Sequence, residues 1–125
     1  PLCIALQILN HIQDCKDDYE QIDRVYLPNT FLKKYNVNLS QLNNNYTEKN
    51  LRLAIDDVLI NTEKLINKAD KFKKIMKNNK LSKETTFILE IAKSLLKLLK
   101  KKDPLKKKVV LNKFDYFKCF VKSFL

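Results

Sequence analysis

Apolar residues recur at helical spacing along most of the chain. The pattern predicts helices over residues 1–19, 30–35, 47–77, 82–103 and 112–125. The stretch 47–77 carries its apolar residues on one face, whereas the stretch 82–103 is apolar over a wide face, which indicates central burial. The sequence therefore predicts an all-α fold.

Residues with good capping chemistry predict the ends of several helices. Thr47 and Ser82 are expected to cap the two long helices, and Asn112 with Asp115 forms a capping-box pattern before the last one. The short helix is expected to end at Asn36 or Asn38, in the role that glycine often takes. An aromatic stripe on the last helix is expected in the core: Phe114, Phe117, Phe120, Val121 and Phe124.

The first helix carries a polar strip that a plain core helix would not have. At about 100° per residue, Gln7, Asn10, Asp14 and Asp18 fall within a strip roughly 80° wide. Apolar residues cover most of the remaining circumference, so we expect this helix to be buried among others. These residues are Ile4, Leu6, Ile8, Leu9 and Ile12.

A carboxylate pair at this spacing predicts a cation. Asp14 and Asp18 stand about 6 Å apart on a regular helix and repel each other unless positive charge lies nearby. Mg²⁺ is the natural candidate, because it prefers hard oxygen ligands and is usually held by one or two carboxylates plus substrate phosphates. The amides of the strip, with Arg24 and Tyr26 shortly after it, suggest a diphosphate site. The other acidic residues nearby are interpreted as solvated charges: Asp17, Glu20 and Asp23.

Charge is distributed unevenly along the 125 residues. The formal net charge is +11, with 6 basic and 8 acidic residues in 1–62 and 19 basic and 6 acidic residues in 63–125. Because 23 of the 25 cations are lysine and no nucleic-acid-binding module is visible, we do not expect nucleic-acid binding. Lys106–Lys108 are interpreted as a solvated helix cap with weak affinity for anionic lipid heads.

The three cysteines and the single histidine do not have the spacing of a metal site. Cys3, Cys15 and Cys119 are interpreted as small buried residues in a reducing compartment, and His11 lies beside the polar strip in either a packing or a site role. No apolar run reaches the roughly 18 residues of a membrane span, and no signal peptide is visible. We expect a cytoplasmic protein, in peripheral contact with the inner membrane if its substrates are lipids.

These residues carry a resemblance to a known family. The stretch ALQILNHIQDCKDDYEQIDRVYLP resembles the second aspartate-rich motif of the squalene/phytoene synthases, and ILEIAKSLLKLLKKKDPLKKKVVLNKFDYF resembles their C-terminal stretch. Gln13, the longer link from Asp18 to Arg24, and Asp23 in place of glycine depart from the phytoene synthase form. They are similar to the bacterial hydroxysqualene synthase branch, which serves hopanoid biosynthesis.

The resemblance implies both a fold and a chemistry. It implies the C-terminal half of an isoprenoid-synthase helical bundle that acts on farnesyl or presqualene diphosphate with Mg²⁺. Asp14 and Asp18 would hold the metal, Arg24 would neutralise the departing anion and Tyr26 would buttress the site. Gln7 and Asn10 would orient diphosphate or metal-bound water. A neutral Gln13 near the ionising centre would tolerate the water that quenches the cation, unless it faces a neighbouring helix.

The resemblance covers only part of the family's domain. The first aspartate-rich motif has no counterpart in residues 1–125, so we expect the chain to be inactive without an N-terminal half that supplies it. The alternative is a non-catalytic relative, either a decaying remnant or an interaction protein like the assembly factors that keep this fold without its chemistry.

Overall fold

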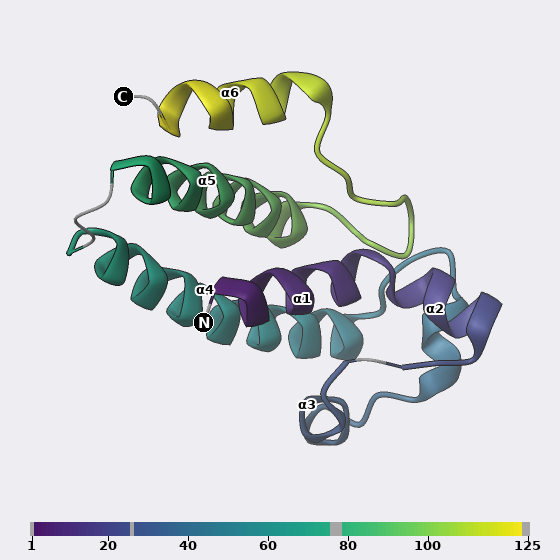
Figure 1. Cartoon of the computed structure of the whole chain (residues 1–125). Coiled ribbons are helices and arrows are strands. Elements are labelled where there is room, and N and C mark those ends of the chain that lie inside the picture. The colour runs from purple at the N-terminus through teal and green to yellow at the C-terminus, as the bar shows by residue number, and fades with distance from the viewer. Residues whose placement is uncertain (1, 26, 76–78, 124–125) are drawn as a thin grey trace.

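The fold is built from helices throughout the described residues. A computed structural model describes residues 2–25, 27–75 and 79–123, and it contains no strand within them. Figure 1 shows the elements, which are α1 (Leu2–Gln13), α2 (Cys15–Ile22), α3 (Asn29–Lys34), a 3₁₀ turn η1 (Leu39–Asn43), α4 (Lys49–Lys73), α5 (Asn79–Lys101) and α6 (Lys113–Ser123). The all-α prediction is confirmed.

Two long helices form the centre of the molecule. α4 and α5 run antiparallel, α1 lies along both of them, and α6 packs on the other side of α5 (Figure 1). The apolar faces predicted for the long helices supply the core, although Phe72 and Ile75 at the end of α4 are exposed. The largest fully buried apolar side chains are Leu9, Ile12, Leu42, Leu51, Ile55, Leu59, Ile66, Leu89 and Leu99.

Several predicted helix ends differ from those in the structure. α5 begins at Asn79, so Ser82 lies inside its first turn, where its carbonyl accepts a hydrogen bond from the Thr86 hydroxyl. Thr47 bonds Asp103 instead of capping α4, whose N-cap position is Glu48. α4 ends at Lys73, earlier than predicted.

Other predicted ends are confirmed by the backbone. Asn36 has φ 53°, the left-handed conformation in which asparagine can replace glycine. At the start of α6 the Asn112 side chain accepts from the Asp115 N–H at 2.8 Å, and the Asp115 carboxylate accepts from the Asn112 N–H at 3.1 Å. This reciprocal pair is the predicted capping box.

Two predicted buried surfaces are exposed. α6 packs against α5 with Cys119 and Ser123 buried and with Phe120 in contact with Phe87. Phe114, Phe117 and Phe120 nevertheless remain more than half exposed, and Phe124 lies outside the described residues. The expectation of an aromatic core stripe is therefore wrong, because among the described residues α6 packs mainly against α5, and Phe114 and Phe117 lie on its exposed face. α1 likewise buries only one face.

No helix in the described ranges combines the length and the apolarity that a membrane crossing requires.

Candidate functional site

The predicted polar strip lines an open groove. Gln7, Asn10, Asp14 and Asp18 border a hollow of about 500 Å³ along α1 and α2. Cys3, Leu6, His11 and Ile22 complete its lining. The four polar residues of the strip thus share one surface, as the helical spacing predicted.

A break in the helix shapes the groove at its centre. The helix predicted to run unbroken to about Tyr19 is divided at Asp14, whose φ of −101° and ψ of 8° lie outside the helical range. Hydrogen bonds still cross the break, from the Asp14 N–H to the Asn10 carbonyl (3.0 Å) and from the Asp18 N–H to the Asp14 carbonyl (2.7 Å). Asp14 therefore occupies the N-cap position of α2, where its side chain makes no capping hydrogen bond and its negative charge is favoured by the helix dipole.

The segment after α2 places Arg24 outside the groove lining. Asp23 ends α2 in the left-handed conformation, with φ 51°, so the family's glycine position is filled here by a residue that tolerates this region. Arg24 is exposed, and its N–H donates to the Asp18 carbonyl at 3.0 Å. Tyr26, predicted to buttress the site, lies outside the described residues.

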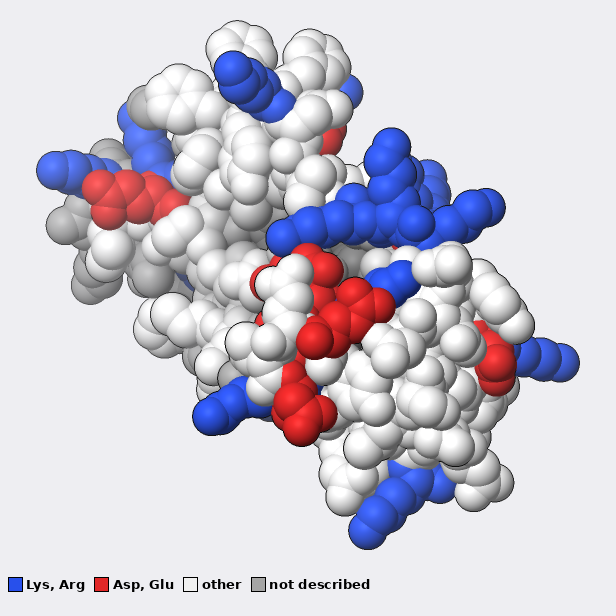
Figure 2. Space-filling view, turned by 90° about the vertical axis from the view of Figure 1, so that its right-hand side faces the viewer, with Lys and Arg blue, Asp and Glu red and all other residues white. Residues whose placement is uncertain are grey.

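The segment between α5 and α6 lies beside Asp14 of the polar strip. Figure 2 shows the lysines gathered directly beside a cluster of acidic side chains. Lys108 places its Nζ 3.3 Å from Asp14 Oδ1 and 3.9 Å from Asp17 Oδ2. We call residues 102–110 the basic segment. Lys108 thus places a positive charge beside Asp14, one of the two carboxylates of the predicted pair.

Gln13 anchors the basic segment and does not line the groove. Its Nε2 donates to the Val109 carbonyl at 2.6 Å, and Val109 itself is buried. The expectation that Gln13 stands near the ionising centre is therefore replaced by the alternative, in which it faces a neighbouring part of the chain. Gln13 holds the segment that carries Lys108.

The other end of the basic segment is fixed to α4. The Asp103 carboxylate accepts hydrogen bonds from the N–H and hydroxyl of Thr47 and from the N–H of Leu105. Burial alone would raise the pKa of Asp103, but these hydrogen bonds outweigh it and hold the pKa below its ordinary value. Arg52 meanwhile donates to the last carbonyls of α5, which otherwise lack partners.

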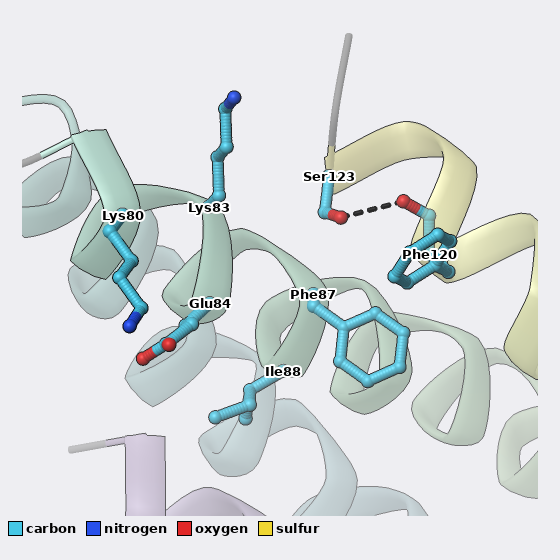
Figure 3. A pocket seen from close by; sticks show the side chains of 7 residues that line it. All are labelled: Lys80, Lys83, Glu84, Phe87, Ile88, Phe120 and Ser123. Carbon is cyan, nitrogen blue, oxygen red and sulfur yellow. Dashed lines mark hydrogen bonds between the residues drawn. The ribbon is translucent and has the colours of Figure 1, made fainter.

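A second hollow is apolar and lies between α5 and α6. It measures about 520 Å³, and Figure 3 shows its lining residues. Phe87 and Phe120 meet edge to face, with ring centroids 6.0 Å apart. Lys80, Lys83 and Glu84 lie on the first turns of α5, to one side of the two rings, and Ser123 lines the hollow from α6 (Figure 3).

The groove offers oxygen ligands that suit a divalent cation. Two acidic residues and two amide residues line it, and the oxygens of such side chains are the hard donors that Mg²⁺ prefers. Among the described residues, no group of three or more histidine, cysteine or acidic side chains is placed to hold a metal ion. This chain therefore brings one carboxylate pair to the groove.

Sequence reasoning missed the residues that approach the strip from far along the chain. Lys108 was interpreted as a solvated charge, although it lies against Asp14. The contrast between a slightly acidic first half and a strongly basic second half was the available signal, because opposite charges favour such contacts. That contrast alone does not identify which lysine makes the contact.

Comparison with known proteins relates the chain to one protein family. The family model for squalene/phytoene synthase matches residues 1–115. The chain is 33% identical over 114 residues to a hydroxysqualene synthase of Zymomonas mobilis, 28% to one of Sinorhizobium fredii and 29% over 115 residues to one of Rhodopseudomonas palustris. These matches cover 91–92% of this chain and 38–39% of each relative.

The matched length defines how far the comparison reaches. The chain spans about two fifths of the length of these curated relatives, and no solved structure matches it. The all-helical architecture agrees with the family that the sequence motifs predicted. The chain belongs to the squalene/phytoene synthase family.

Proposed function

We propose that this chain forms the diphosphate-binding part of a Mg²⁺-dependent enzyme that converts presqualene diphosphate to hydroxysqualene. The observation that carries the proposal is the groove in which Gln7, Asn10, Asp14 and Asp18 stand together. All three relatives are hydroxysqualene synthases, which favours this product over phytoene. Farnesyl diphosphate, as the precursor of presqualene diphosphate, is a second substrate of the same chemical class.

Each residue of the groove would have a role that follows from its side-chain chemistry. Asp14 and Asp18 would hold Mg²⁺, which when bound supplies Lewis-acid charge neutralisation for the leaving diphosphate. Gln7 and Asn10 would orient diphosphate oxygens or water by hydrogen bonds from their amides. Arg24, exposed just beyond α2, would approach the departing anion.

Catalysis would require a partner segment. In this proposal, the part of the family domain that corresponds to the relatives' remaining length covers the groove and brings the other aspartate-rich motif. It would also cover exposed apolar residues of α1 and α6, among them Ile4, Phe114 and Phe117. Peripheral membrane contact follows from the lipid nature of the substrate and belongs to the same proposal.

A chimera tests this function. The chain is joined to the non-matching part of the Zymomonas mobilis relative and given labelled presqualene diphosphate, with products separated by gas chromatography. We expect hydroxysqualene, and loss of at least about a hundredfold in rate when Asp14 and Asp18 are both changed to Asn, because the metal ligands are removed. Asp56→Asn is the matched control, since Asp56 pairs with Arg52 away from the groove.

The outcomes separate this proposal from its alternatives. Phytoene, or squalene as the sole product, would contradict the assignment to the hydroxysqualene synthase branch. No turnover from a folded chimera would favour a non-catalytic interaction protein. The exposed apolar hollow between α5 and α6 would then be the feature that such a protein uses.

A further inference from the structure

Lys108 joins the basic segment to the polar strip. Lys108 lies 3.3 Å from Asp14, which lines the groove, and 3.9 Å from Asp17, which does not. Its side chain is 56% exposed, so the ammonium group stands at the groove edge in contact with water. An exposed ion pair of this kind is weak, and exchange of its partner costs little.

The position of Lys108 is fixed by its neighbours in the chain. On one side Val109 is buried and receives the Gln13 amide, and on the other Leu105 is buried beside Asp103. Asp103 in turn is bonded to Thr47 at the start of α4. The backbone of the segment is therefore held at both ends, while the lysine side chains between those ends are exposed.

Charge at the groove changes when its ligands arrive. In the proposed reaction a divalent cation occupies the carboxylates, and the attached diphosphate brings several negative charges to the same edge. A lysine then loses its partner at Asp14 and gains a stronger one in the phosphate oxygens, since charge-assisted hydrogen bonds to phosphate are among the strongest in proteins.

We propose that Lys108 is a diphosphate-positioning residue, which neutralises Asp14 in the empty groove and transfers to the diphosphate when Mg²⁺ binds. This inference rests on the proposed function of the groove. It gives the basic segment a role in holding the leaving diphosphate. It also predicts that loss of the Lys108 charge changes the affinities for Mg²⁺ and for diphosphate in opposite directions.

Calorimetric titration of the full chain tests this role with MgCl₂ alone and with inorganic diphosphate at saturating Mg²⁺. In Lys108→Met, affinity for Mg²⁺ alone should rise about twofold to fivefold, because a competing cation is removed. Affinity for diphosphate should fall about tenfold, because a charge-assisted contact is lost. Lys107→Met is the matched control, since it removes the same charge from the same segment and leaves the Lys108 ion pairs in place.

If Lys108 had only a structural role, its substitution would change the affinities for Mg²⁺ and diphosphate in the same direction or leave both unchanged. Equal behaviour of Lys108→Met and Lys107→Met would overturn the inference, even if Asp14→Asn/Asp18→Asn abolishes Mg²⁺ binding and so supports the proposed function. Conversely, unchanged Mg²⁺ binding in that double variant would contradict the metal site. If diphosphate bound without Mg²⁺ and Lys108→Met weakened that binding, the role of Lys108 in holding diphosphate would stand. A helical wild-type chain that binds neither ligand would count against both.

Discussion

At the scale of single residues, Asp103 joins two distant parts of the chain. Its carboxylate receives hydrogen bonds from Thr47, 56 positions earlier, and from the N–H groups of Leu105 and Lys106 just after it. Asp103→Ala should lower the free energy of unfolding by about 2 kcal/mol, because several donors lose a charged acceptor. Chemical denaturation followed by circular dichroism measures this loss. Asp70→Ala, which removes only surface ion pairs, should cost less than about 1 kcal/mol.

The same carboxylate predicts a dependence on pH. Because the folded state lowers the pKa of Asp103, its contribution is complete above the ordinary value of 3.8 and is lost as pH falls through the lowered value. The difference in stability between wild type and Asp103→Ala should therefore narrow as the pH is lowered below about 4. A difference that stays constant in acid would show that the carboxylate charge is not involved.

At the scale of single elements, the end of α2 depends on an unusual backbone conformation. Asp23 adopts φ 51°, where a side chain costs energy that glycine does not. Asp23→Gly should leave stability unchanged or raise it by up to about 1 kcal/mol, whereas Asp23→Val should lower it by at least about 1 kcal/mol. Thermal unfolding compares the two variants. Equal melting temperatures of the valine and glycine variants would contradict the prediction.

Local sequence patterns predicted most of the helices. Features that depend on contacts between residues far apart in the sequence could not be predicted from them. The strip from Gln7 to Asp18 was predictable because its members lie within three turns of helix. The break at Asp14 was missed, because a helical wheel assumes regular geometry. Thr47 was misassigned as a cap since its partner, Asp103, lies at the far end of α5. The contact from Gln13 to Val109 spans 96 positions, and no local pattern encodes it.

At the scale of the whole molecule, the outer face of α6 is apolar and uncovered. Phe114 and Phe117 are each about 60% exposed, and similar exposure occurs at Phe72 and Ile75 near the end of α4. Large exposed apolar patches bind hydrophobic dyes and promote association. We expect this chain, expressed alone, to show helical circular dichroism together with dye binding and self-association.

Substitution on α6 separates this surface from a loose core. Phe114→Ser/Phe117→Ser should reduce dye fluorescence and self-association while the helical signal is kept, because both rings face solvent. Leu89→Ala in the core should instead lower the free energy of unfolding by about 3 kcal/mol and increase dye binding. If the double serine variant binds as much dye as wild type, the dye reports a loosely packed interior instead. A cooperative melt of a monomeric wild type without dye binding would overturn the expectation.

The placement of the three thiols gives the groove its own chemical reporter. Cys3 is exposed and lines the groove, whereas Cys15 and Cys119 are buried, and burial raises the pKa of the Cys15 thiol to about 12. Since alkylation requires an accessible thiolate, iodoacetamide should modify Cys3 in the folded chain and spare the other two. Mass spectrometry can follow this single reaction over time. Added Mg²⁺ and inorganic diphosphate should slow it if they occupy the groove, and leave its rate unchanged if they bind elsewhere.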